Sequence, residues 1–325
     1  MKPTAEKYIG LGNVPIGIGA VLKGWDMTEE DYRDSSKLPV VDFRAMTGDC
    51  PRDCFFCFTD KDKKTLTFEE IKAVIDQLAD MNTHAIDYLG EGEPTVDKDF
   101  FGIVEHTSKR GIQPIVFTEA ATKLRNKGFV QRLYDSGATV CPKLDSLFNE
   151  EYQNRVVGDR DKSYFGKRNE AINLLIEQGF NKIREDGTTR LGFDMVISRK
   201  NVYEVEQTLR YCRDRNLWVV FSFYLPAGRS GRNDFDRSLM VPEQEKTKMR
   251  DIVRKVDGEY GFNHQIFSNF ATHHCVEFMQ IYGDGRVSPC PGNETEIGNV
   301  RTHTIRELEQ RLLREARKKK LSKKR

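Results

Sequence analysis

The sequence predicts an α/β fold in which strand–helix units repeat along a parallel sheet. Beyond about residue 38, short β-rich runs alternate with amphipathic helical stretches, which is typical of successive βα units. The 325 residues, of which 31% are charged, also fit a globular chain with a large apolar core. A right-handed succession of such units curls into an open or closed barrel, and functional residues then gather at the C-terminal ends of the strands.

Six runs rich in β-branched and aromatic residues are expected to form strands. They cover residues 39–46, 83–89, 112–118, 138–145, 190–198 and 217–225. The helix after the first strand has the clearest start, because Thr67 and Glu70 form a capping box before a helical repeat of apolar residues. Later helices are expected at about 97–110, 120–135, 165–178, 202–215 and 242–256, several of them closed by a glycine.

The chain is expected to divide into four parts. Residues 1–38 form an N-terminal extension, residues 39–258 the barrel, residues 259–303 a small module, and residues 304–325 a final helix with a basic tail. The module is separated because glycines beside two cysteines interrupt the βα pattern there. The last fifteen residues carry a net charge of +8 in a chain whose total is +2. A solvated helix end explains this tail better than a nucleic-acid arm.

Location can also be predicted from the sequence. The longest apolar stretch covers residues 14–22, far short of the roughly 20 residues that cross a bilayer, and no secretory signal is apparent. Three of the seven cysteines lie within residues 50–57, which suits thiolate chemistry in a reducing compartment better than disulfides. We therefore expect a cytoplasmic protein that does not bind membranes.

Cys50, Cys54 and Cys57 are spaced CxxxCxxC on the loop that leaves the first strand. Three thiolates can hold three corners of a cubane iron–sulfur cluster, whereas a fully protein-bound cluster or a structural zinc needs four ligands. No fourth ligand is nearby, because the next cysteine is Cys141. One iron is therefore left open, and an open metal position lets a bound molecule react there.

This motif resembles that of the radical S-adenosylmethionine (SAM) enzymes, which have CxxxCxxC with an aromatic residue before the last cysteine, here Phe56. The resemblance implies a 4Fe-4S cluster on Cys50, Cys54 and Cys57, with SAM chelated to the open iron. It also implies that an electron from the cluster cleaves SAM, and that the 5′-deoxyadenosyl radical abstracts hydrogen from a substrate. Such chemistry needs a barrel that keeps the radical from water.

Residues 90–95, Gly-Glu-Gly-Glu-Pro-Thr, follow the second expected strand and resemble the GGEP motif of the family. The resemblance places Gly92, Glu93 and Pro94 in the SAM site, with Gly92 and Glu93 against the amino group of SAM. Glu91 replaces the first glycine of the motif, so its role stays open. An ordinary Gly-Pro turn is the alternative for this segment alone, but its register with the cysteines favours a functional role.

Cys141 and Lys143, at the end of the fourth expected strand, are candidate catalytic residues. The segment resembles the family's S-L-D strand with Lys143 in place of serine, and alternation puts Cys141, Lys143 and Asp145 on one face. If that face lines the barrel, Lys143 could meet the carboxylate of SAM or substrate, and Cys141 could donate a hydrogen atom or bind a cluster. A structural ion pair for Lys143 and simple packing for Cys141 are the alternatives, and packing is favoured for Cys141.

The C-terminal module resembles the SPASM and twitch extensions of the family. Residues 226–229 match its P-x-G-R turn, and Cys275, Gly285 and Cys290 match its C-x9-G-x4-C opening. Cys275 and Cys290 are thus candidate ligands of a second, auxiliary cluster, but the further cysteines of a full module are missing. Three possibilities stay open: His273, His274, Cys141 or Cys212 completes the ligand set, one iron faces the substrate, or the module is a lid without a cluster.

The resemblance therefore implies a partial (β/α)6 barrel with a twitch-like extension. We expect a small polar substrate, such as a sugar, aminocyclitol or nucleotide, that is oxidised, epimerised or rearranged, and an electron donor such as flavodoxin or ferredoxin. A peptide-modifying enzyme is the alternative within the family. The competing class is a cluster- or zinc-bearing protein that binds nucleic acid through its basic tail, but it leaves Glu93 and the six βα units unexplained. A simple ferredoxin would need four cysteines per cluster.

Overall fold

The structure is a computed structural model that describes residues 40–61, 65–160, 162–184, 189–224, 236–260, 279–289 and 295–322. The strands are β1 (Val40–Arg44), β2 (Ala85–Tyr88), β3 (Gln113–Thr118), β4 (Thr139–Pro142), β5 (Gly192–Ile197), β6 (Trp218–Phe223), β7 (Met279–Tyr282), β8 (Arg286–Ser288) and β9 (Gly298–Asn299). The α-helices are α3 (Phe68–Asp80), α4 (Phe100–Lys109), α5 (Lys127–Asp135), α6 (Glu150–Val156), α7 (Tyr164–Gln178), α8 (Val205–Asp214), α10 (Glu243–Glu259) and α11 (Ile305–Ser322). Short 3₁₀ turns are η2 (Pro94–Val96), η3 (Val202–Glu204) and η4 (Arg237–Leu239).

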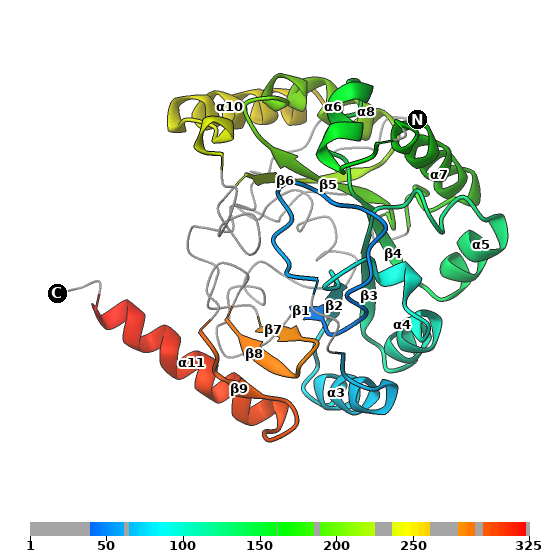
Figure 1. Ribbon diagram of the computed structural model, residues 1–325. Coiled ribbons are helices and arrows are strands. Elements are labelled where there is room, and N and C mark those ends of the chain that lie inside the picture. Colours follow the sequence, from blue (N-terminus) through cyan, green and yellow to red (C-terminus); the bar gives the residue numbers. More distant parts are fainter. Residues whose placement is uncertain are drawn as a thin grey trace.

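The strands form a curved parallel sheet in chain order. β1 to β4 lie side by side, and two parallel bridges, Val140–Leu191 and Lys143–Asp194, connect β4 to the parallel pair of β5 and β6. Figure 1 shows the strands along the inside of an arc and the helices along its outside. The predicted α/β class, a partial barrel of βα units, is confirmed.

β7 joins this sheet on the other side of β1. The two strands run parallel, with Phe43 opposite Ile281, and β8 and β9 continue the edge as antiparallel strands. The described part of the expected module at 259–303 thus extends the barrel sheet. The boundary near residue 259 stays a prediction.

The outer face of the sheet packs on the helices. Phe43, Ile86 and Val116 belong to one buried apolar cluster with helix residues such as Ile75 and Leu78 of α3. Burial of each such side chain contributes roughly 1.5–3 kcal/mol to the free energy of unfolding, relative to an exposed side chain. Because side chains alternate along a strand, the residues between them face the inside of the barrel, where the helices do not cover them.

Two helical segments differ from the sequence expectation. The helix expected at 120–135 begins only at Lys127, capped by Asn126, and Ala120 in the preceding turn has a φ of +65° that a helix does not allow. The helix α6 was not expected. It has seven residues, too few for a clear apolar repeat, and its start is fixed by Asn149, which accepts a hydrogen bond from Tyr152 N at 2.9 Å.

The predicted capping box of α3 is present. Thr67 Oγ1 accepts a bond from Glu70 N at 3.2 Å, and Thr67 N donates to Glu70 Oε2 at 2.7 Å. Glu70 also pairs with Arg301 Nε at 2.6 Å, which ties the loop before α11 to α3. The start of α11 buries Ile305 and Leu308 in the outer core.

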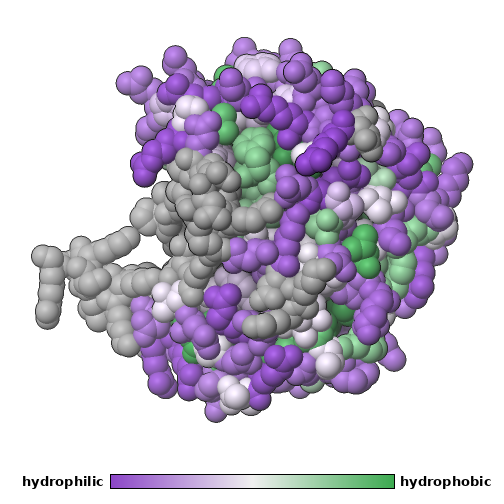
Figure 2. Space-filling model, viewed as in Figure 1, coloured by the Kyte–Doolittle hydropathy of each residue, from purple (hydrophilic) through white to green (hydrophobic). Residues whose placement is uncertain are grey.

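The outside of the molecule is mostly polar. Hydrophilic residues cover most of the rim of the face shown in Figure 2, as expected for helices that turn their apolar sides to the sheet. Among the helices of the described ranges, none combines the length and the apolar character that crossing a bilayer requires.

Candidate active site

The three cysteines of the CxxxCxxC motif lie on the loop after β1, at the C-terminal ends of the strands. Cys50, Cys54 and Cys57 are half-buried. The loop is held against the end of α6, where Asp53 N and Phe55 N donate to the carbonyls of residues 157 and 156 at 3.0 and 3.2 Å. These bonds fix the middle of the loop, so the cysteines are carried on ordered backbone.

Arg52 ties the same loop to two further parts of the barrel. Its Nε lies 2.8 Å from Glu119 Oε2, after β3. Its guanidinium lies 4.8 Å from the centre of the Tyr164 ring, at the start of α7. Arg52 itself is only 13% exposed, so this ion pair is shielded from solvent and orients the backbone between Cys50 and Cys54.

The environment of the cysteines disfavours bare thiolates. The pKa of Cys50 is raised to about 11 and that of Cys54 to about 12, chiefly by burial and to a smaller extent by the neighbouring cysteines. A bound metal reverses this preference, because it holds the thiolate directly and supplies positive charge. The donor set, three sulfurs on one loop, fits an iron–sulfur cluster.

The cysteines are not arranged around a single ion. Within the described ranges, no three His, Cys, Asp or Glu side chains are gathered closely enough for one metal ion. A cubane cluster has a different requirement, because each thiolate binds a separate iron at its own corner. The residues present therefore fit a cluster better than a zinc ion.

The loop after β2 packs directly on the cysteine loop. Gly92 N donates to Thr47 O at 2.9 Å, and Glu93 N donates to Asp49 O at 2.8 Å. A Cβ atom at Gly92 would lie only 2.2 Å from Asp49 O, so only glycine allows this approach. The two motifs that the sequence singled out thus meet next to Cys50.

Glu93 is buried and its carboxylate is fully engaged. Its Oε1 accepts bonds from Thr95 Oγ1 and Thr118 Oγ1, both at 2.6 Å, and its Oε2 accepts from Glu119 N at 2.6 Å. Burial, followed by the charge of Glu119, raises the pKa of Glu93 to about 7. Glu93 caps η2, in which Pro94 is the first residue, and ties it to the end of β3. A contact between Glu93 and the amino group of SAM stays a prediction.

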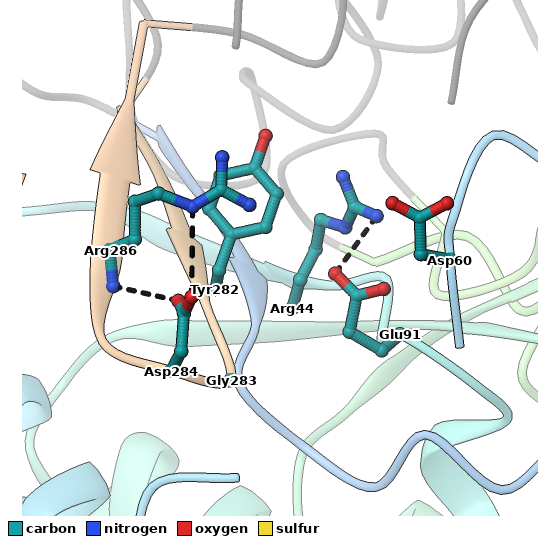
Figure 3. Close-up of a pocket in the computed structure, with 7 residues that line it drawn as sticks. All are labelled: Arg44, Asp60, Glu91, Tyr282, Gly283, Asp284 and Arg286. Carbon is teal, nitrogen blue, oxygen red and sulfur yellow. Dashed lines mark hydrogen bonds and ion pairs between the residues drawn. The ribbon is translucent and has the colours of Figure 1, made fainter. Parts of the chain in front are cut away.

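Glu91, whose role the sequence left open, pairs with β1. Its Oε1 lies 2.9 Å from Arg44 Nη2, and both side chains are 4% exposed. Arg44 also lies 4.7 Å from the centre of the Tyr282 ring on β7. Figure 3 shows this pair in a small pocket. Its lining residues are Arg44, Asp60, Glu91, Tyr282, Gly283, Asp284 and Arg286.

Cys141 and Lys143 both face the inside of the barrel. Lys143 Nζ lies 3.1 Å from Asp145 Oδ1 and 4.3 Å from the centre of the Phe56 ring, so it reaches the cysteine loop. Cys141 is fully buried, and burial, followed by the charge of Asp194, raises its pKa well above the usual range. The ion pair with Asp145 is the structural role that the sequence offered as the alternative for Lys143. Catalytic roles for Lys143 and Cys141 stay predictions.

Three aspartates on the inner face were not predicted as site residues. Asp42 of β1 stands opposite Asp87 of β2, and Asp194 of β5 bridges to Lys143. Asp87 and Asp194 are partly exposed, whereas their outward-facing strand neighbours are buried, so solvent reaches the inner face. One signal could have revealed them: a single aspartate lies within each of the otherwise apolar strands VVDFR, AIDY and GFDMVI.

The C-terminal cluster candidates lie outside the described residues. This applies to Cys275, Cys290, His273 and His274, and to the P-x-G-R turn at 226–229. The auxiliary cluster and its ligand set therefore stay predictions. Cys212, considered as a further ligand, is buried in the outer core, where it packs among apolar side chains.

Comparison with known proteins decides the family. Residues 45–212 match the model of the Radical SAM superfamily, and this range includes the cysteine loop, the Gly92 loop and strands β2 to β5. The chain belongs to the radical SAM superfamily. It is a radical SAM enzyme, and its cofactors are a 4Fe-4S cluster and SAM, as predicted.

Curated relatives act on different kinds of molecule. The radical SAM chain is 31% identical over 128 residues to PqqA peptide cyclase of Bradyrhizobium diazoefficiens, which covers 38% of this chain and 33% of the relative. It is 23% identical to GTP 3′,8-cyclase of Marinobacter nauticus over 80% of this chain and 71% of the relative. It is also 23% identical to mycofactocin maturase MftC of Mycolicibacterium smegmatis over 79% of this chain and 63% of the relative. The chain thus spans only a third of one of these proteins and about two thirds of the others.

Solved structures share the fold of this radical SAM enzyme. The structure of native anSMEcpe with bound AdoMet is 16% identical and covers 83% of this chain and 79% of that one, with a TM-score of 0.62. Streptococcus suis SuiB bound to S-adenosylmethionine is also 16% identical and covers 88% of this chain and 67% of that one, with a TM-score of 0.63. At these identities the likeness shows the fold alone.

Proposed function

We propose that Cys50, Cys54 and Cys57 hold the 4Fe-4S cluster and that SAM binds between this cluster and the loop around Gly92. The observation that carries this proposal is the backbone contact between the two loops, at the C-terminal ends of β1 and β2. Catalytic sites of βα barrels form at this end of the strands. A cluster held by these three cysteines would supply the single electron for reductive cleavage of SAM, which would start hydrogen-atom abstraction from the substrate.

The protein's own residues position these groups. Arg52 and the bonds to α6 keep the cysteine loop in place, so that three sulfurs are presented together. Gly92 allows the second loop to approach without a side chain between them. The carboxylate of Glu93 holds that loop to the end of β3. The electron comes from an external one-electron donor, for which a flavodoxin or ferredoxin is the proposed partner.

The proposed substrate is a small polar molecule that binds on the inner face of the sheet. Support comes from the polar character of this face, where Asp87 and Asp194 are partly exposed. Lys143, which bridges to Asp194, reaches Phe56 of the cysteine loop. Hydrogen abstraction there would leave a substrate radical, which gives an oxidised product if it loses an electron to an acceptor and an epimerised or rearranged product if it regains a hydrogen atom. GTP 3′,8-cyclase, by its name, is a relative that acts on a nucleotide.

A peptide substrate is the second candidate, and a different observation favours it. The relative with 31% identity is named PqqA peptide cyclase, and one structural neighbour is SuiB bound to precursor peptide SuiA. A peptide would have to enter the barrel from the side of the strand ends, since the helices cover the outer face (Figure 1). Both candidates share the same cluster and SAM site.

The test is anaerobic reconstitution with iron and sulfide, followed by SAM and dithionite. We expect the wild-type protein to bind iron and sulfide and to form 5′-deoxyadenosine, and we expect Cys57→Ala to bind less iron and to form no 5′-deoxyadenosine. Cys212→Ala is the matched control, because Cys212 is buried in the outer core and should leave both unchanged. A wild-type protein that stays free of iron after reconstitution would refute the proposed function.

A further inference from the structure

A row of three polar residues crosses the inner face of the sheet. Gln280 of β7, Asp42 of β1 and Asp87 of β2 are paired in register across these neighbouring strands. Strands are about 4.8 Å apart, so side chains of one row on the same face are within reach of one small ligand. The row lies just before the C-terminal ends of its strands, beneath the two loops of the proposed SAM site.

The two aspartates are placed where they repel each other. Like charges opposite one another on neighbouring strands are destabilising. Burial raises the pKa of Asp42 to about 7 in spite of the charge of Arg44, and burial and the charge of Asp42 raise that of Asp87 well above its usual value. Without a bound cation, the pair must hold a proton or bear the repulsion.

The cations of the described residues near this row are already engaged. Arg44 pairs with Glu91 at 2.9 Å and donates to Gln280 Oε1 at 3.5 Å, and Lys143 pairs with Asp145 at 3.1 Å. Asp194 adds a third carboxylate to the inner face, and it accepts a bond only from Ser222 Oγ, at 3.4 Å, among the side chains of the described ranges. When these aspartates are ionised, the cations of the described residues therefore do not balance their charge.

Gln280 provides an independent sign of a ligand. The side chain is completely buried, and its Oε1 accepts a bond from Tyr282 Oη at 2.7 Å. Its Nε2 has no hydrogen-bond partner in the part of the chain that the structure describes, and the same holds for Asp87 Oδ1. A buried amide donor without an acceptor is destabilising. An acceptor that belongs to a ligand would remove this cost.

We propose that Gln280, Asp42 and Asp87 bind an amino alcohol group of the substrate. The two aspartates receive the ammonium, which neutralises their repulsion, and Gln280 Nε2 donates to the adjacent hydroxyl oxygen. An ammonium alone, as on a lysine side chain, would leave Gln280 unpaired. A hydroxyl alone would leave the aspartates uncompensated. The row therefore selects an amine-bearing polyol, such as an amino sugar, which narrows the substrate class of the proposed function and rests on it.

The test is calorimetric binding to the reconstituted protein with SAM and without reductant, so that no turnover is needed. The probes are glucosamine, glucose, Nα-acetyl-lysine amide and magnesium chloride. We expect glucosamine to bind at least about tenfold more tightly than glucose, because removing one partner of a buried charge pair commonly lowers affinity by more than tenfold. Asp42→Asn and Asp87→Asn should each abolish this preference. Gln280→Leu should weaken the binding of glucosamine and leave the binding of the lysine probe unchanged.

The contrary outcomes are equally definite. Equal binding of glucosamine and glucose, or an undiminished preference in both aspartate variants, would overturn the proposal. Tighter binding of the lysine probe would point to a peptide, and displacement of glucosamine by magnesium would make the row a metal site. Asp251→Asn, on the exposed side of α10, is the control. Formation of 5′-deoxyadenosine by the wild-type protein is measured separately, so a failure of the proposed function is distinguished from a failure of this row.

Discussion

A Cβ atom at Gly92 would lie 2.2 Å from Asp49 O and 2.6 Å from the backbone carbon of Gly48. Gly92→Ala should therefore push the two loops apart, and we expect a cost of about 1–3 kcal/mol in the free energy of unfolding, typical of overpacking. We also expect weaker SAM binding by the reconstituted protein. Urea unfolding and equilibrium binding measure the two effects.

The matched control for Gly92 is Gly166 in α7, where a Cβ atom would meet nothing within 4 Å. Gly166→Ala should stabilise the helix by about 0.5–1 kcal/mol and leave SAM binding unchanged. If Gly92→Ala behaves like Gly166→Ala in both measurements, the close contact between the loops is not required.

The inner-face aspartates predict a pH dependence of stability. The pKa of Asp42, about 7, and that of Asp87 lie above the ordinary value for aspartate, so the folded protein binds more protons than the unfolded chain above about pH 4. The free energy of unfolding contributed by this pair therefore falls as the pH rises through about 4 to 7. Asp42→Asn should reduce the difference in stability between pH 5 and pH 8, measured by urea unfolding of the metal-free protein. An unchanged difference would show that folding does not raise the pKa of Asp42.

At the scale of single elements, the capping box of α3 gives the clearest prediction. Thr67→Ala removes the acceptor for Glu70 N, and we expect a loss of about 1 kcal/mol in the free energy of unfolding. Thr247 in α10 is the control, because its hydroxyl donates only to the preceding turn of its own helix among the described residues. Thr247→Ala should change stability by less than about 0.5 kcal/mol. Equal effects of the two substitutions in thermal unfolding would refute the role of the box.

The elements with strong local signals could be predicted from the sequence. The six strands of the barrel lie at the predicted β-rich runs, and α3 begins at the predicted capping box. The short helix α6 could not be predicted, because seven residues held by a cap at Asn149 show no repeat. The late start of α5 depends on the positive φ of Ala120, which is set by contacts of the turn and leaves no pattern in the sequence.

The site was predictable to the extent that it depends on motifs. CxxxCxxC and the GEGEP segment identified the residues of both loops, and spacing alone could not show that Gly92 packs on Asp49. The partner of Glu91 was unpredictable for the same reason, since its ion pair with Arg44 joins the loop after β2 to the end of β1 through tertiary packing. The inner-face aspartates were visible as isolated acids in apolar strands, but only the register shows that Asp42 and Asp87 face each other.

At the scale of the whole molecule, the pairing of β7 with β1 brings together residues that are far apart in the sequence. Arg44 and Gln280, which are 236 positions apart, share a hydrogen bond across these strands. No local pattern contains such a contact. The pairing of β7 with β1 places Tyr282 and Gln280, from the C-terminal part of the chain, next to the Glu91 loop and the aspartates. The substrate side of the proposed site is therefore built from both ends of the described chain.

The sequence-based prediction of a second cluster is tested by counting iron. If Cys275 and Cys290 hold an auxiliary cluster, Cys275→Ala should lower the iron content of the reconstituted protein by about one cluster's share, and Cys57→Ala should do the same independently. Dehydrogenation of the substrate would be favoured by such an electron-accepting cluster. Unchanged iron in Cys275→Ala would exclude this residue as an essential ligand and favour redox-neutral turnover.

The central claim is that one iron of the cluster on Cys50, Cys54 and Cys57 stays open to SAM. Electron paramagnetic resonance of the dithionite-reduced, reconstituted Cys275→Ala variant, with and without SAM, tests it most directly, because only the proposed SAM cluster would contribute to the spectrum. We expect SAM to change the cluster spectrum, as a ligand bound to one iron must, and we expect Gly92→Ala in the same background to weaken this change. A cluster spectrum that saturating SAM leaves untouched would contradict the central claim.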